Sequence, residues 1–142
     1  MKFLIDELIH FSLALGTGLV CYYKFDNPWL ILVALLTGFF IDADHLFDYF
    51  AFSGLRFKLK HFLDVEYYMM PAGKVYIPLH GWEYVLVFWF LGQWIGLPGL
   101  EWAMSLTYFI HLSWDNFSFR HHPLAYSFIY RLLNNFSLES FK

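Results

Sequence analysis

The sequence predicts an all-α protein: a four-helix transmembrane bundle with an interfacial loop helix and an amphipathic C-terminal helix. Two observations lead to this prediction. Hydrophobic residues make up 59% of the 142 residues and charged residues only 15%, more apolar surface than a soluble fold of this size could bury. Four apolar stretches also follow one another, each close to the roughly 20 residues that a helix needs to cross a bilayer. We therefore expect a single integral membrane domain, residues 1–142.

Turn-forming residues separate the predicted spans. An Asp-Asn-Pro sequence at residues 26–28 places a helix cap before a proline in the first helical turn. Two glycines and a proline in residues 96–99 break the third stretch from the fourth, which predicts a tight helical hairpin. The first stretch lacks the pattern of a secretory signal and carries His10, so we interpret it as a retained span. The spans are expected at about residues 8–23, 28–47, 79–95 and 97–114.

The remaining segments suit the membrane surface. Residues 48–78 mix basic and aromatic side chains, which predicts a short amphipathic helix among the headgroups, followed by a turn at residues 70–73. The tail from residue 123 to residue 136 has apolar residues at spacings of four. This spacing indicates an interfacial helix, and a helix packed on the bundle is the alternative. The six Trp, 10 Tyr and 18 Phe suit a surface that meets headgroups and acyl chains.

Charge predicts the orientation. Four spans place the N-terminus, the long loop and the tail on one side, and every Lys or Arg except Lys24 is on that side. By the positive-inside rule this side is cytoplasmic, so we expect a multi-pass inner-membrane protein with both termini in the cytoplasm. A net charge of −3 without a basic run argues against nucleic acid as a partner. The lone Cys21 excludes a metal site built from cysteines.

Placing an ionisable side chain inside an apolar membrane span costs free energy, so such a residue usually has a function. Here they gather near span ends that the topology places at the cytoplasmic level, which predicts one shared site. Three His–carboxylate pairs are three or four residues apart and so share a helical face. The residues concerned are His10, Asp42, Asp44, His45, His80, Glu83, His111 and Asp115.

Histidine and carboxylate ligands without thiolate favour zinc, with manganese or iron(II) as alternatives. More candidate ligands are present than one tetrahedral ion needs, so either two ions bind or some residues orient the others. Glu83 or Asp44 could remain free as a general base. Arg120 could bind phosphate, and His121 and His122 could add a ligand, bind an anionic headgroup or simply be exposed. The expected metal ligands are His10, Asp42, Asp44, His45, His80, His111 and Asp115.

In these motifs the sequence resembles the bacterial and archaeal membrane-bound metal-dependent hydrolases. The matching features are an early His10, an Asp-x-Asp-His segment at residues 42–45, His80 before a later span, and a His-x-x-x-Asp motif at residues 111–115. The family usually has Leu-Pro before the Asp-x-Asp-His segment and a second histidine near His80. Both are missing here, which leaves the number of metals and full activity open. The motifs are also distantly similar to zinc-dependent phospholipase C.

The resemblance implies a metal-dependent hydrolase, and the membrane setting suggests a phosphoester of a lipid or lipid-linked substrate at the cytoplasmic interface. A metal-ion or proton transporter is the first alternative, because buried His and Asp chains also mark ion paths. A structural membrane protein whose polar cluster only locks the helices together is the second. The oligomeric state is not predicted.

Overall fold

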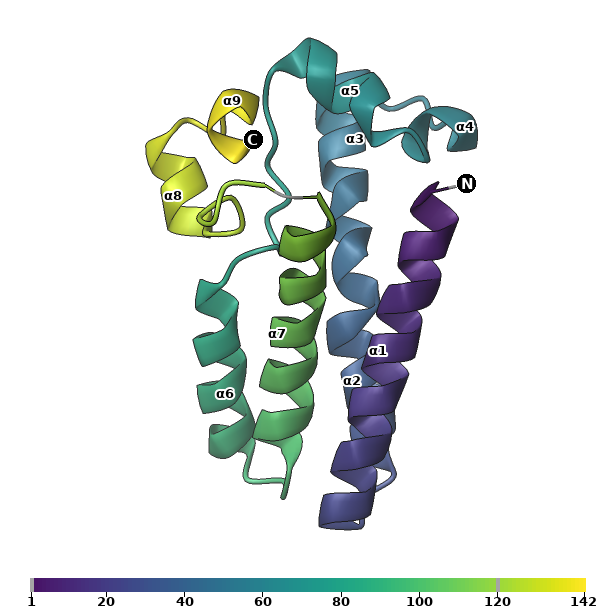
Figure 1. Ribbon diagram of the computed structural model, residues 1–142, viewed down its shortest axis with the longest axis vertical. Coiled ribbons are helices and arrows are strands. Elements are labelled where there is room, and N and C mark those ends of the chain that lie inside the picture. The colour runs from purple at the N-terminus through teal and green to yellow at the C-terminus, as the bar shows by residue number, and fades with distance from the viewer. Residues whose placement is uncertain (1, 120) are drawn as a thin grey trace.

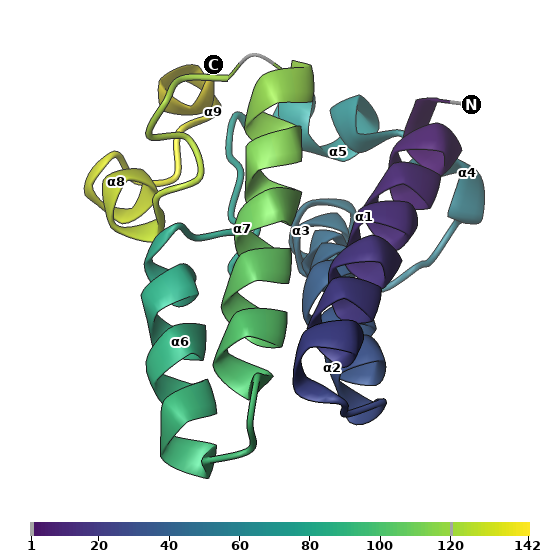
Figure 2. The ribbon, with the colours of Figure 1, turned by 60° about the horizontal axis from the view of Figure 1, so that its bottom comes forward.

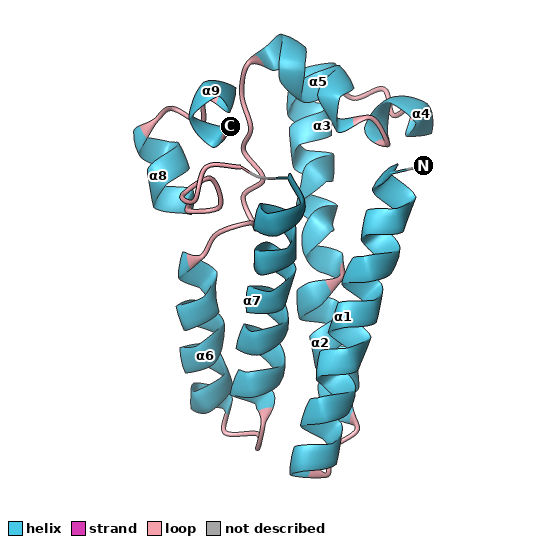
Figure 3. Cartoon of the chain, viewed as in Figure 1, coloured by secondary structure: helices cyan, strands magenta, loops and turns pink. Residues whose placement is uncertain are grey.

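The structure, a computed structural model, describes the chain at residues 2–119 and 121–142. The described part contains helices and loops but no β-strand, which confirms the all-α prediction (Figure 3). A single isolated bridge in this part pairs Lys74 with Ser137. The elements are α1 Lys2–Phe25, α2 Trp29–Gly38, η1 Phe40–Asp44, α3 His45–Ser53, α4 Leu59–Phe62, α5 Val65–Ala72, α6 Glu83–Ile95, α7 Leu100–Phe119, α8 Phe128–Leu133 and α9 Leu138–Phe141.

Four helical rods form a bundle. In Figures 1 and 2, α1, α2 with α3, α6 and α7 lie side by side and alternate in direction. The packed pairs are α1 with α2, α6 with α7, and α7 with both α1 and α2. Both ends of the chain, together with α4, α5, α8 and α9, lie at the upper end of the bundle in Figure 1. The two short connections, at residues 26–28 and 96–99, lie at the opposite end.

The predicted second span is not one continuous helix. The 3₁₀ turn η1 separates α2 from α3, and the rod bends by 40° at this break. Such a break is tolerated when neighbouring groups satisfy the freed backbone. Here the ring nitrogen Nδ1 of His111 donates to the carbonyl of Gly38, at the end of α2. The sequence prediction missed the break because Phe39, Phe40 and Ile41 continue the apolar stretch of α2 into it.

The predicted third span begins later than expected. Helix α6 starts at Glu83 and has 13 residues, so residues 79–82 form a loop. Tyr108 of α7 fixes this loop. Its hydroxyl donates a hydrogen bond to the Leu79 carbonyl and accepts one from the Gly81 amide. The expectation that His80 and Glu83 share a helical face is therefore wrong.

The long loop and the tail also differ from their predictions in detail. The loop forms α4 and α5, and the predicted turn reduces to Gly73, which ends α5 in the left-handed conformation with φ 62°. The tail is not one helix over residues 123–136, since Asn135 and Phe136 have φ values of 53° and 55° that end a helix. Instead α8 and α9 pack on the bundle, where Phe141 is buried in the core. The packed alternative describes this tail better than an interfacial helix.

Glycines bring the helices into close contact. A Cβ added at Gly18 would lie 2.9 Å from Ile31 Cα, so α1 and α2 nearly touch. A Cβ added at Gly38 would lie 2.2 Å from Thr107 Cγ2, so α2 and α7 are similarly close. Gly16, by contrast, faces open space. These approaches set the distance between the rods just below the polar site described next.

Within the described residues, one helix is long and apolar enough to cross a membrane. This is Ile5–Phe25 in α1, and only 28% of its most apolar window is buried. The bent pair of α2 with η1 and α3 passes the same length and composition criteria when taken as one span, whereas α6 is shorter. Large apolar side chains on the outside of the rods are exposed, including Val20, Leu36 and Phe90. The core helix of a soluble protein would bury most of this surface.

Candidate metal centre

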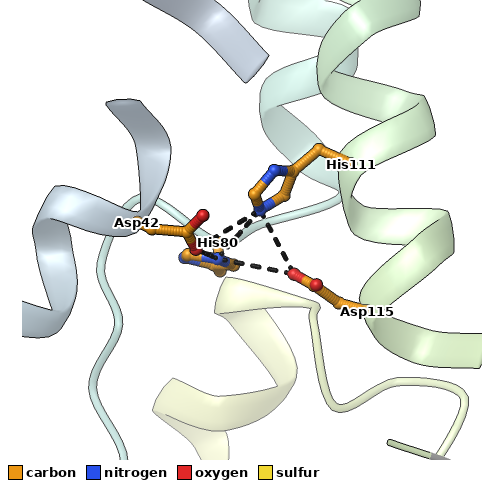
Figure 4. A group of neighbouring side chains, drawn as sticks. All are labelled: Asp42, His80, His111 and Asp115. Atoms are coloured by element: carbon orange, nitrogen blue, oxygen red, sulfur yellow. Dashed lines mark hydrogen bonds and ion pairs between the residues drawn. The ribbon is translucent and has the colours of Figure 1, made fainter. Parts of the chain in front are cut away.

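Four ligand atoms from three elements converge inside the upper half of the bundle. They are Asp42 Oδ1 from η1, His80 Nε2 from the loop before α6, and His111 Nε2 and Asp115 Oδ2 from α7 (Figure 4). His80 and His111 are 1% exposed and Asp115 is 3% exposed. Groups so deeply buried must satisfy one another or a bound cation.

Five of the six separations among these atoms suit tetrahedral coordination, and the sixth, between the two carboxylate oxygens, is within 4.8 Å. His80 Nε2 lies 3.2 Å from Asp42 Oδ1, 3.3 Å from His111 Nε2 and 3.6 Å from Asp115 Oδ2. His111 Nε2 lies 3.5 Å from Asp42 Oδ1 and 3.2 Å from Asp115 Oδ2. Four ligands placed about 2.0–2.2 Å from a zinc ion at the corners of a tetrahedron are about 3.3–3.6 Å apart. The site therefore has the size for a divalent ion of this kind.

Hydrogen bonds to the far sides of the two histidine rings fix their orientation. His111 Nδ1 donates to the Gly38 carbonyl at 2.8 Å, and His80 Nδ1 donates to Asp44 Oδ2 at 3.0 Å. A neutral ring whose proton is on Nδ1 presents an unprotonated Nε2 to the centre, which is what binding a metal requires. Asp44 Oδ2 also accepts from the Leu79 amide at 2.7 Å, so this carboxylate holds both the ring and the backbone of the His80 loop.

Two further buried groups anchor the loop that carries His80. Asp48 accepts hydrogen bonds from the amides of Tyr76 at 2.8 Å and Ile77 at 3.0 Å. Arg131 in α8 is fully buried, and its guanidinium donates to the carbonyls of Ile77 at 3.1 Å and His80 at 2.5 Å. Burial lowers the pKa of this guanidinium, while the Asp44 carboxylate opposes the shift. The C-terminal segment thus helps to position a ligand from the middle of the chain.

A cavity of about 220 Å³ leads to the centre. Three residues of the ligand set, Asp42, His80 and Asp115, line it. Its walls are mostly apolar and come largely from α5 and the C-terminal segment, with side chains such as Met69, Ile77, Tyr126 and Phe141. An apolar cavity that ends on a few convergent polar groups is the usual form of a ligand site.

The structure brings together most of the expected ligands but gives them different roles. Asp42, His80, His111 and Asp115 form the tetrahedral set, and Asp44 accepts a hydrogen bond from His80. Asp44, His45 and His80 form another group whose ligand atoms are close enough to hold a metal ion. His45 lies at the edge, with Nε2 3.8 Å from Asp42 Oδ1. His10 lies on the opposite side of the two carboxylates: its Nδ1 is 3.1 Å from Asp42 Oδ2 and its Nε2 is 2.9 Å from Asp115 Oδ1.

The other expected site residues separate. Glu83 accepts hydrogen bonds from the Ser127 hydroxyl and from the amides at the start of α8, so it caps that helix instead of facing the centre. His121 lines the cavity. His122 is exposed and accepts a hydrogen bond from the Leu124 amide within a turn. Arg120 lies outside the described residues.

Sequence reasoning missed three residues near the centre. Asp6 and Glu7 line the cavity, and Arg131 holds the His80 loop. The spacing rule could have found Asp6, because Asp6 and His10 are four residues apart on one helix. No signal in the sequence marks Arg131, which looks like an ordinary cation on an amphipathic segment.

Comparisons with protein families, with curated proteins and with solved structures found no match.

Proposed function

We propose that this protein is a membrane-embedded, metal-dependent hydrolase of a phosphoester in a lipid or lipid-linked substrate, similar to the membrane-bound metal-dependent hydrolases. The observation that supports this most strongly is the tetrahedral set of buried ligand atoms at the inner end of an apolar cavity. Zinc is the favoured ion, with manganese or iron(II) as alternatives.

The membrane placement rests on the exposed apolar surface of the rods. We infer that α1, α2 with α3, α6 and α7 cross the inner membrane, and that their upper end in Figure 1 faces the cytoplasm. The short helix α6 needs local bilayer thinning. Lys24 is the only Lys or Arg of the sequence on the opposite side in this arrangement. The centre would then lie at the level of the cytoplasmic leaflet.

The cavity supports a substrate with an apolar part. Side chains of α5 and α9, including Met69, Met70, Leu138 and Phe141, form walls that suit an acyl or isoprenoid chain. The polar lining includes Asp42, His80 and Asp115 of the ligand set. A lipid whose ester group reaches the inner end would therefore present its scissile bond beside the ligand set.

The chain's own residues divide the chemical work. A divalent ion, when bound, polarises the ester and makes water a competent nucleophile near neutral pH. Asp44 and the Gly38 carbonyl keep the two ligand imidazoles in the correct tautomer. Glu7 lines the cavity and makes no hydrogen bond among the described residues, so it is free to accept the proton of the attacking water as general base.

The experiment uses the purified full-length protein in phospholipid vesicles with Mn²⁺ or Zn²⁺ supplied. We expect release of a phosphoester product from the phospholipid or from a soluble phosphodiester. His111→Ala should lose both bound metal and activity, whereas the matched control His122→Ala, at an exposed histidine, should keep both. Glu7→Gln should lower kcat by about 10²–10⁴-fold with its metal content unchanged. No cleavage of either substrate with either ion would contradict the proposal.

One observation favours the hydrolase over an ion transporter. A transport path needs polar groups that continue from the centre towards the other end of the bundle. In that half, Thr17 and Ser105 are buried, but their hydroxyls donate to main-chain carbonyls of their own helices, at 2.8 Å and 2.5 Å. Hydroxyls engaged in this way are not available as ligands for an ion. The buried Thr107 hydroxyl makes no hydrogen bond among the described residues, but it lies only one helical turn from His111 and does not extend a path towards the other end.

A further inference from the structure

His10 has an unusual environment that the tetrahedral set does not explain. Its side chain is 2% exposed, and its Nδ1 lies 3.1 Å from Asp42 Oδ2, where it can donate a hydrogen bond. That donation leaves Nε2 with a lone pair. Nε2 lies 2.9 Å from Asp115 Oδ1, an ion-pair distance, although neither atom makes a well-formed hydrogen bond among the described residues. Two buried electron-pair donors at this distance repel each other unless a proton or a metal ion lies between them.

A third ligand stands beside this pair. Asp6 lies one turn before His10 in α1, and its carboxylate offers an oxygen within 4.8 Å of ligand atoms of His10 and Asp115. The indole Nε1 of Trp114 donates to Asp6 Oδ1 at 3.0 Å, which orients the carboxylate. Asp6 and Asp115 both line the cavity, so a ligand there is accessible from the substrate side.

We propose that Asp6, His10 and Asp115 bind a second divalent ion, and that Asp115 bridges the two ions through its two carboxylate oxygens. This inference deepens the proposed function and rests on it. Asp115 Oδ2 belongs to the tetrahedral set, whereas Asp115 Oδ1 faces His10. One imidazole and two carboxylates leave coordination positions for water and substrate, a donor set that suits Mn²⁺ or Zn²⁺.

Charge in the cavity gives an independent reason for the second ion. Five carboxylates line the cavity, and Lys142 is the one Lys or Arg among its described lining residues. The carboxylates are those of Asp6, Glu7, Asp42, Glu66 and Asp115. One divalent ion leaves this region negative, which would repel a phosphodiester anion. A second divalent ion offsets the remaining negative charge. Paired ions also bind the attacking and leaving oxygens of a phosphoryl group.

The test counts ions in the full-length protein. The purified protein is stripped with chelator, dialysed against Mn²⁺, and analysed for metal per chain and by electron paramagnetic resonance. The wild type should bind two ions and show an exchange-coupled Mn²⁺ spectrum. His10→Asn keeps a nitrogen donor near the Nδ1 position but has no atom at Nε2, so it should bind one ion with an uncoupled spectrum. His122→Asn, at an exposed histidine, is the matched control and should keep two.

A second variant leaves all proposed ligands in place. Trp114→Phe removes the donor that orients Asp6, and should weaken the second ion about 10–100-fold while the first binds as before. A wild-type count of one that His10→Asn leaves unchanged would overturn the second site but leave the proposed hydrolase standing. In that case His10 is a protonated partner of the two carboxylates. A wild-type count of zero would overturn both proposals.

Discussion

Substitution of Gly38 by alanine tests how closely the metal centre depends on helix packing. Gly38 ends α2, and its carbonyl accepts the hydrogen bond from His111 Nδ1 that orients this ligand. The new Cβ would lie 2.2 Å from Thr107 Cγ2 and 3.1 Å from Ala14 Cβ. Because apolar carbons pack at about 3.5–4.0 Å, α2 and α7 must move apart by roughly an ångström.

The magnitude follows from two opposing effects. Overpacking of this kind costs about 1–3 kcal/mol, whereas Gly→Ala in a helix returns about 0.5–1 kcal/mol. We expect Gly38→Ala to lower the free energy of unfolding by about 1–2 kcal/mol. The larger effect should be on metal binding, because weakening the bond between Gly38 and His111 should reduce affinity about 10–100-fold.

The assay combines zinc competition titration with denaturant unfolding of the purified protein in detergent. Gly16→Ala is the matched control, since a Cβ at Gly16 meets nothing within 4 Å, and it should leave affinity unchanged. Gly38→Ala combined with Thr107→Ala removes the clashing methyl. The Thr107 hydroxyl has no hydrogen-bond partner, so its loss costs little. The double variant should recover most of the affinity.

Two results would refute this reasoning. If Gly38→Ala binds zinc as tightly as the wild type, the Gly38 carbonyl does not orient His111 in a way that matters. If the double variant binds no better than Gly38→Ala alone, the contact with Thr107 is not the cause of the defect.

Three further predictions concern residues around the centre. Arg131→Met should lower the free energy of unfolding by about 3 kcal/mol in chemical denaturation, because buried carbonyls lose a charged donor, and a change below about 1 kcal/mol would contradict this. Glu83→Gln should keep metal content and activity within a few fold and cost about 1 kcal/mol of stability; loss of activity in the folded variant would instead support Glu83 as the base. Burial lowers the pKa of His121 from 6.5, and Asp115 opposes the shift, so the unfolded chain takes up this proton more readily and the free energy of unfolding falls as pH drops through 6.5. His121→Asn should flatten that slope in unfolding titrations at pH 5–7, and an unchanged slope would count against a buried His121.

The sequence was a good guide to the architecture. Apolar stretches and turn residues locate four helical rods, although the second is broken at η1 and the third begins only at Glu83. Their alternation brings His10, Asp42, His80 and His111 close together. The prediction of a shared site succeeds because an ionisable group inside an apolar stretch costs free energy unless it has polar partners, and such partners come from the other helices. The pattern says less about where helices stop. The break at η1 and the loop at residues 79–82 depend on hydrogen bonds from side chains of other helices, which periodicity does not contain.

The role of each residue within the site was harder to predict than which residues belong to the site. Spacing suggested that Glu83 faces the centre, but that assumed a helix that includes His80. Once the loop replaces the first helical turn, Glu83 turns to the tail and caps α8. Asp44 was expected as ligand or base; its Oδ2 accepts a hydrogen bond from His80, and with His45 and His80 it also forms a group that could hold a metal ion, so its role stays a prediction. Such distinctions depend on sub-ångström geometry between segments far apart in the chain.

The anchoring of the His80 loop by Arg131 bears on how the protein is made. Because α8 follows the four rods in the chain, the His80 loop gains this anchor only after all four rods have been synthesised. The candidate ligand set would therefore close late, and a chain cut before α8 would lack the support that positions His80.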